Sequence, residues 1–76
     1  MKPNSDQHND FFAHMPLPGV TFEHNEAIEI IGGDHAGEFG SIISVELLGD
    51  DPSYLVELGS GRDVVISQSL LRTAEA

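Results

Sequence analysis

Histidines and carboxylates are the side chains of this chain that could bind a metal ion, because neutral imidazole and carboxylate oxygens are common ligands. The candidates are His8, Asp10, His14, His24 and His35. Most of them fall in a polar N-terminal stretch, and the sequence contains neither a His-x-x-x-His pair nor a cysteine. Metal sites that can be identified from sequence usually show such pairs. The sequence therefore predicts exposed, polar histidines, no metal site and no other cofactor.

Covalent catalysis would need an activated serine beside a base and a third, orienting group. The available serines include Ser41, Ser60 and Ser67, and nothing in the pattern brings a base to any of them. The adjacent carboxylates Asp50 and Asp51 fall in a predicted turn, where an acidic protein would carry them in any case. We therefore predict a protein that is not an enzyme and has no small-molecule substrate.

The chain is strongly acidic, with 13 Asp and Glu residues against 3 Lys and Arg and a formal net charge of -10. Its three cations are Lys2, Arg62 and Arg72. Nucleic-acid binding depends on Lys and Arg that neutralise phosphates, so this balance argues against nucleic acid as a partner. A protein partner with a basic surface fits better. The alternative is that the acidity only keeps a small protein soluble and monomeric.

The length of 76 residues allows one domain at most. No apolar stretch approaches the length of a membrane span, and the N-terminus lacks the apolar region of a secretory signal. We therefore expect no membrane partner and a cytoplasmic location.

Residues 1–22 are expected to form a flexible, disordered N-terminal arm. The first ten residues are polar and without periodicity, and Pro16 and Pro18 hold the next stretch extended. The apolar side chains of the arm are too many for a plain linker. We expect the arm to fold back onto the domain from Leu17 onward, or else to serve as an interaction segment.

Residues 23–76 have the pattern of an all-β domain, with about five short strands separated by turn residues. Glycine, aspartate and proline interrupt this region so often that no helix of ordinary length fits. The expected strands are Ala27–Ile31, Ser41–Leu48, Ser53–Leu58, Arg62–Ile66 and Leu70–Thr73, with one 3₁₀ turn starting at Ser67–Ser69. The expected core is Ile28, Ile30, Ile42, Val45, Tyr54, Val56, Leu58, Val64, Ile66 and Leu70 or Leu71. Closing such strands into a small barrel would remove the exposed sheet edges.

A glycine loop lies between the first two expected strands, with the pattern Gly33-x-x-x-Gly37-x-x-Gly40-x-Ile42-x-x-Val45. Glycine tolerates positive φ and close backbone approach, so we predict structural roles for Gly33, Gly37 and Gly40, and for Gly61 in a later hairpin turn. The pattern resembles the KOW motif of small SH3-like barrels found in ribosomal and transcription-elongation proteins. This resemblance implies a five-stranded SH3-like barrel and extends more loosely from Glu26 to Arg72.

The KOW resemblance also implies a factor associated with nucleic acid or ribonucleoprotein, in transcription or translation. Family members that bind RNA often carry a basic residue just before the middle glycine, where this chain has Ala36. We therefore expect the fold to be shared more closely than the activity.

The primary hypothesis is a small acidic protein-interaction module that docks on a protein partner or a larger assembly, and the KOW-type factor is its alternative. The residues expected to contact the partner are Asp34, His35, Glu38, Phe39, Asp50, Asp51, Tyr54 and Arg62. Phe39 and Tyr54 would be the aromatic anchors of the interface, although a place in the core is favoured for Tyr54.

Overall fold

The computed structural model describes residues 1–15 and 17–74 as one short helix, one 3₁₀ turn and five β-strands. In chain order they are α1 (Ser5–Phe12), β1 (Ala27–Ile30), β2 (Phe39–Leu47), β3 (Ser53–Leu58), β4 (Asp63–Ser67), the 3₁₀ turn η1 (Gln68–Leu70) and β5 (Leu71–Thr73). The strands lie close to the ranges expected from the sequence, so the prediction of a five-stranded β domain is confirmed. Pro16, Glu75 and Ala76, assigned above to the arm and the domain, lie outside the described residues. No helix within residues 1–15 and 17–74 has the length and apolar character needed to cross a lipid bilayer.

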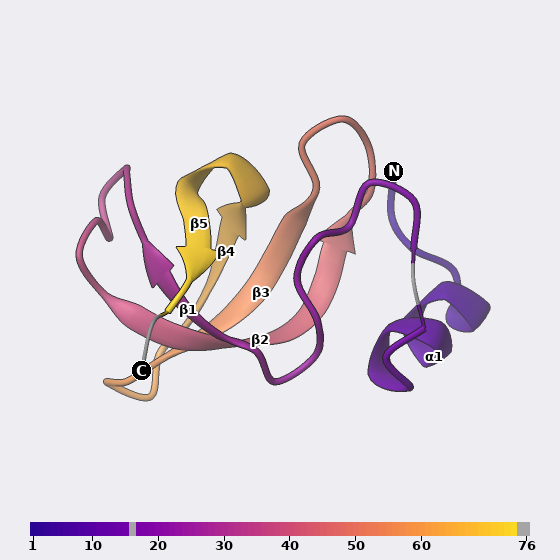
Figure 1. Cartoon of the computed structure of the whole chain (residues 1–76), viewed down its shortest axis with the longest axis horizontal. Helices are drawn as coiled ribbons and strands as arrows, with labels where there is room; N and C mark the ends of the chain where they lie inside the picture. Colours follow the sequence, from indigo (N-terminus) through magenta and orange to yellow (C-terminus); the bar gives the residue numbers. More distant parts are fainter. Residues whose placement is uncertain (16, 75–76) are drawn as a thin grey trace.

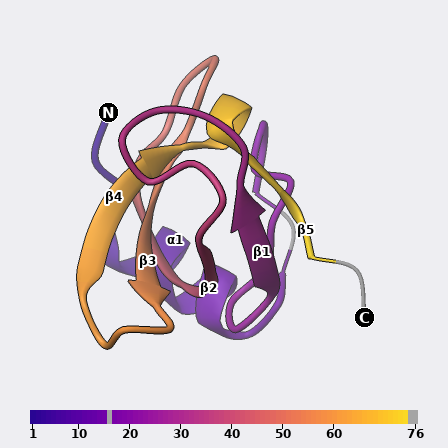
Figure 2. The ribbon, with the colours of Figure 1, turned by 90° about the vertical axis from the view of Figure 1, so that its left-hand side faces the viewer.

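All five strands form one antiparallel sheet in the order β4-β3-β2-β1-β5. β2 pairs with both β1 and β3, and register shifts at Ile42/Ser44 and Val45/Leu47 interrupt its pairing with β3. Such bulges bend and twist a strand, and the sheet curls around its inner face (Figure 2). The prediction of a closed barrel is wrong. β4 and β5 are the two edges of the sheet, and the turn η1 separates them.

The core fills the inner face of the sheet. In β3 the side chains alternate, so that Tyr54 and Val56 have no exposed surface whereas Glu57 is exposed. The buried apolar residues are Phe11, Leu17, Phe22, Ile28, Ile30, Ile42, Val45, Tyr54, Val56, Leu58, Ile66 and Leu71, and Val64 and Leu70 pack against them partly buried. Every core residue predicted from the sequence belongs to one of these two groups. Phe11 is a core residue that the sequence pattern does not predict.

The N-terminal segment contains a helix where its polar composition predicts a disordered arm. The Asn4 side chain accepts a hydrogen bond from the Gln7 N–H, and the Gln7 side chain accepts one from the Asn4 N–H, which together form a capping box. The helix places Phe11 against the core, where it is 3% exposed and its ring centroid lies 6.5 Å from that of Tyr54. This tertiary packing stabilises a helix too short to form alone. Helix α1 covers one end of the sheet (Figure 1).

Residues 17–22 run back along the domain, as the sequence predicts, and the first and last side chains of this segment are buried. Gln68, at the start of η1, holds the segment in place. Its Oε1 accepts hydrogen bonds from the Thr21 N–H (3.0 Å) and from the Tyr54 hydroxyl, and its Nε2 donates to the Gly19 carbonyl (3.2 Å). The segment is therefore tied to the β domain by this amide side chain and by the Tyr54 hydroxyl, which accepts a hydrogen bond from the Phe22 N–H (3.5 Å).

Burial raises the pKa of the Tyr54 phenol above its ordinary value of 10.0. The unfolded chain loses the phenol proton near that ordinary value, whereas the folded protein keeps it to higher pH. The stability gained from burying the neutral phenol is therefore complete below the ordinary value and is lost as the pH rises above it. As the pH rises above 10.0, we expect the urea midpoint of the wild type to fall more steeply than that of Tyr54→Phe, which has no phenol to ionise. Equal slopes for the two proteins would contradict this expectation.

Candidate functional site

The glycine loop between β1 and β2 is a compact turn held by backbone hydrogen bonds. The Gly37 N–H donates to the Ile30 carbonyl (2.7 Å), and the Ile30 N–H donates to the Glu38 carbonyl (2.9 Å). Gly33 and Gly37 have φ of +79° and +90°, a region that glycine enters without the steric cost of a Cβ. The loop returns the chain directly to the start of β2.

At the start of β2 the backbones of β2 and β3 come unusually close. A Cβ atom on Gly40 would stand 2.5 Å from the Glu57 carbonyl oxygen. The Gly59 N–H donates to the Phe39 carbonyl at 3.1 Å, which extends the contact into the β3–β4 turn. Gly61 in that turn has φ of +90° and open space beside it. Glycine is therefore required at position 40 because the backbone of β3 lies too close for a side chain, whereas glycine suits position 61 because of its positive φ.

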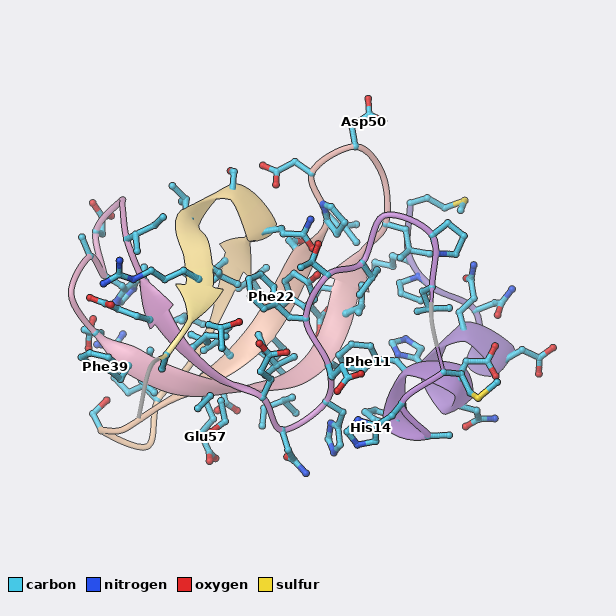
Figure 3. All side chains as sticks on the ribbon, viewed as in Figure 1. Phe11, His14, Phe22, Phe39, Asp50 and Glu57 are labelled. Atoms are coloured by element: carbon cyan, nitrogen blue, oxygen red, sulfur yellow. The ribbon has the colours of Figure 1, made fainter. Side chains whose placement is uncertain are left out.

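A shallow groove of about 460 Å³ opens at this end of the sheet, and we name it the Phe39 groove. Its lining consists of Phe39, Gly40, Ser41, Glu57, Leu58, Gly59 and Gly61. The Phe39 side chain is 56% exposed and is the one aromatic ring among these lining residues. Phe39 and Glu57 lie at the same end of the molecule in Figure 3. Exposed aromatic side chains beside a polar rim are the kind that often anchor protein interfaces.

Two carboxylates stand opposite each other beside the Phe39 groove. The register of β3 and β4 pairs Glu57 with Asp63, and both residues are exposed. Directly opposite side chains share one face of the sheet, and like charges at such positions are destabilising. Three ion pairs form among residues 1–15 and 17–74, and none of them includes Glu57 or Asp63. The fold therefore tolerates an unfavourable pair of charges at the rim of the groove.

The two arginines of the domain form no ion pair with this rim. Arg72 is bound to Glu29, with both Nε (2.8 Å) and Nη2 (2.5 Å) donating to one carboxylate oxygen. In the glycine loop, His35 Nδ1 lies 2.7 Å from a Glu38 carboxylate oxygen. Arg62 is exposed and belongs to none of the three ion pairs of the described part of the chain. The groove thus lies in a negative field that an external cation would reduce.

Comparison with models of known protein families and with curated proteins finds no match.

The contact residues predicted from the sequence do not gather on one surface. Phe39 lines the Phe39 groove, whereas Asp34, His35 and Glu38 belong to the glycine loop before β2 and Arg62 to the β3–β4 turn. The glycine loop and the β3–β4 turn lie toward the same end of the sheet (Figure 1). Asp50 lies on the β2–β3 loop, well away from Phe39 (Figure 3). The two loops that were expected to bind one partner together therefore point in different directions.

Two of the predicted contact residues, Asp51 and Tyr54, have structural roles in the fold. The Asp51 carboxylate accepts hydrogen bonds from the Ser69 N–H (2.9 Å) and the Ser69 hydroxyl (2.8 Å), and so holds the β2–β3 loop against η1. Tyr54 has no exposed surface, so it lies in the core, as favoured, and cannot be a surface anchor.

Glu57 and Asp63 are rim residues that are absent from the predicted contact set. A usable signal was present in the sequence, since Gly59-Ser60-Gly61 marks a tight hairpin turn and thereby sets the register of the strands on either side. Counting outward from that turn places the two carboxylates opposite each other.

His14 and His24 lie near each other without forming a ligand set. The ring centroid of His24 lies 4.9 Å from that of Phe12 and 6.3 Å from that of His14. His24 Nδ1 is 2.8 Å from the Ile43 carbonyl oxygen. No group of three or more His, Cys, Asp or Glu side chains is arranged to hold a metal ion in the part of the chain that the structure describes.

Proposed function

We propose that this chain is a small, acidic, non-enzymatic protein-interaction module that binds a basic segment of a partner protein at the Phe39 groove. The observation that carries this function is the exposed Phe39 ring beside Glu57 and Asp63, which face each other and take part in none of the described ion pairs. An arginine or lysine side chain suits both features. It can stack on the aromatic ring by a cation–π interaction and form charge-assisted hydrogen bonds with the carboxylates.

The fold is in keeping with a protein-interaction module, but it does not by itself identify the function. The strand order, the 3₁₀ turn between β4 and β5 and the glycine loop between β1 and β2 are compatible with an SH3-like, KOW-type relationship. The role of a nucleic-acid factor has less support, because Arg72 is already bound to Glu29 and few cations remain to contact phosphates. We therefore favour a basic protein segment as the partner.

The function can be tested with an arginine-rich peptide, followed by amide chemical shifts in NMR spectra over a range of salt concentrations. We expect the shifts to concentrate at Phe39, Glu57 and Asp63, and the affinity to fall as salt screens the charges. Phe39→Ala is expected to weaken binding about tenfold. Phe12→Ala is the matched control, since Phe12 is 45% exposed but lies in α1, away from the groove.

Two outcomes of that titration would count against the proposed function. Equal binding of a glutamate-rich peptide would remove charge as the basis of recognition. Tight, salt-tolerant binding of an RNA or DNA oligonucleotide would replace the protein-interaction module by the nucleic-acid factor.

Glu57→Gln is expected to move stability and binding in opposite directions. Removing one of two opposed like charges should raise the free energy of unfolding by about 0.2–1 kcal/mol, while weakening the binding of the arginine-rich peptide. Chemical denaturation and peptide titration on the same protein measure the two effects. Glu29→Gln serves as the control, because it breaks the pair with Arg72 and should not raise stability. A loss of stability in Glu57→Gln would show that this carboxylate has a favourable partner within the fold.

A further inference from the structure

Strand β4 is a free edge of the sheet, with β3 as its one neighbour in the strand order. Two hydrogen bonds determine which backbone groups of β4 face β3. The Leu58 N–H donates to the Arg62 carbonyl (2.8 Å), and the Gln68 N–H donates to the Pro52 carbonyl (2.7 Å). Because antiparallel pairing alternates along a strand, the even-numbered residues of β4 bond to β3. The backbone groups that point to the open side are the N–H and C=O of Asp63 and Val65 and the N–H of Ser67, whose C=O belongs to the turn η1 that Ser67 caps.

This edge lacks most of the devices that usually prevent strand addition. Natural sheets protect their edges with lysine, proline, bulges or very short strands. β4 pairs with β3 without a register shift and contains neither lysine nor proline. Its central side chain, Val65, is 56% exposed. The opposite edge, β5, has 3 residues, and its Arg72 is bound to Glu29.

Charge determines which kind of strand the edge can accept. A second copy of this chain would bring together two molecules that each carry a formal charge of -10, which opposes self-association. Asp63 lies on the edge strand itself, and Glu57 is its register partner on β3. Along the same face Val65 is paired with the partly buried Leu55, so an apolar position follows the acidic one. A basic strand that also carries apolar side chains complements this surface.

We propose that β4 accepts an additional β-strand from the basic partner, as an extended segment in which a basic and an apolar side chain stand two residues apart and therefore on the same face. The basic side chains face Glu57 and Asp63, and the apolar ones cover Val65 and Leu55. Backbone hydrogen bonds to the open side of β4 supply affinity, and the side chains supply specificity. This binding mode rests on the proposed function, since the Phe39 groove lies beside the hairpin end of the same edge.

The test uses a short lysine–valine peptide, in which lysine and valine stand two residues apart with a threonine between them, and amide hydrogen exchange of the full chain measured by NMR. At saturating peptide we expect the exchange of the Val65 and Ser67 amides to slow about tenfold or more, because they become hydrogen-bonded. The amides of Val64 and Ile66 are the internal controls, since they already face β3. The matched peptide carries an N-methyl group on every backbone nitrogen, which keeps its charge but removes the donors on both of its edges. It should not slow exchange at either edge amide.

Val65→Pro removes the outward N–H without removing a bond to β3, and proline is tolerated at sheet edges for this reason. It should abolish the protection, whereas Val65→Thr should retain it.

If the lysine–valine peptide shifts the signals of Phe39 and Glu57 without protecting the edge amides, strand addition is wrong and the proposed function stands. If neither this peptide nor the arginine-rich peptide perturbs the protein at millimolar concentration, both are wrong. Protection that rises with protein concentration in the absence of peptide would assign the edge to a second copy instead. The N-methylated peptide decides the question on the wild type even if Val65→Pro does not fold.

Discussion

Phe11→Ala is expected to lower the free energy of unfolding by about 3–5 kcal/mol, which is a large part of the stability of a domain of this size. The Phe11 side chain is 3% exposed, and its ring centroid lies 6.5 Å from that of Tyr54 and 6.2 Å from that of His24. Truncation would leave a cavity between α1 and the end of the sheet. Urea denaturation followed by circular dichroism measures the loss.

Phe12→Ala provides the matched control for this experiment. Phe12 is the next residue in the same helix, but it is 45% exposed, so its truncation should cost less than about 1 kcal/mol. If the two variants are equally stable, α1 does not contribute to the core. A deletion that begins the chain at Leu17 removes Phe11 as well, and it should therefore be destabilised to a similar extent as Phe11→Ala.

Gly40→Ala is expected to destabilise the protein by about 2–3 kcal/mol, although it adds a single methyl group. The new Cβ would stand 2.5 Å from the Glu57 carbonyl oxygen, a backbone atom that can move only if β2 and β3 separate. The consequence is a weakened β2–β3 ladder at the start of β2. The midpoint of chemical denaturation measures the change.

Gly59→Ala is the control for Gly40→Ala. Apart from atoms of the two adjoining residues, the nearest atom to a Cβ on Gly59 would be the Phe39 carbonyl oxygen at 3.9 Å. That distance is an ordinary contact and requires no movement. A Gly40→Ala protein that matches Gly59→Ala in stability would show that β2 and β3 are further apart than the structure has them.

The strands were predictable because their signals are local. Apolar side chains alternate in Ser53–Leu58, and glycine, aspartate or proline ends each run. The alternation and the turn residues therefore indicate the same strand boundaries. The same regularity identifies the inner face of the sheet and therefore nearly all of the core. The open sheet was not predictable in this way, because whether β4 and β5 meet depends on the curvature of β2 and not on local sequence.

The sequence did not predict helix α1, because the polar composition of this segment indicates disorder more strongly than its capping pattern indicates a helix. Residues 1–12 contain an Asn-x-x-Gln pattern that forms the capping box, but an amide pair is a weak signal without an apolar face behind it. The helix is stabilised by Phe11, whose burial depends on the distant Tyr54. Contacts of that kind arise from tertiary structure and leave no periodicity in the sequence.

The candidate site was predicted in part. Phe39 was singled out by its type and by its place after the glycine loop, and the structure exposes its side chain. The opposed carboxylates Glu57 and Asp63 become a feature only when the hairpin register is known. Asp51 shows the reverse case, since an acidic turn residue that suggests a contact surface instead holds η1.

The strand order also bears on how the protein reaches its native state. β2, β3 and β4 form a meander whose pairings join neighbouring parts of the chain, whereas β1 meets β5 across nearly the whole β region, with Ile30 opposite Leu71. Closing a long loop costs more entropy than closing a short one, and pairings between distant residues slow folding. The meander is therefore expected to nucleate folding, with β5 docking late. The same order makes β5, short and at an edge, the strand expected to detach first when the domain opens locally.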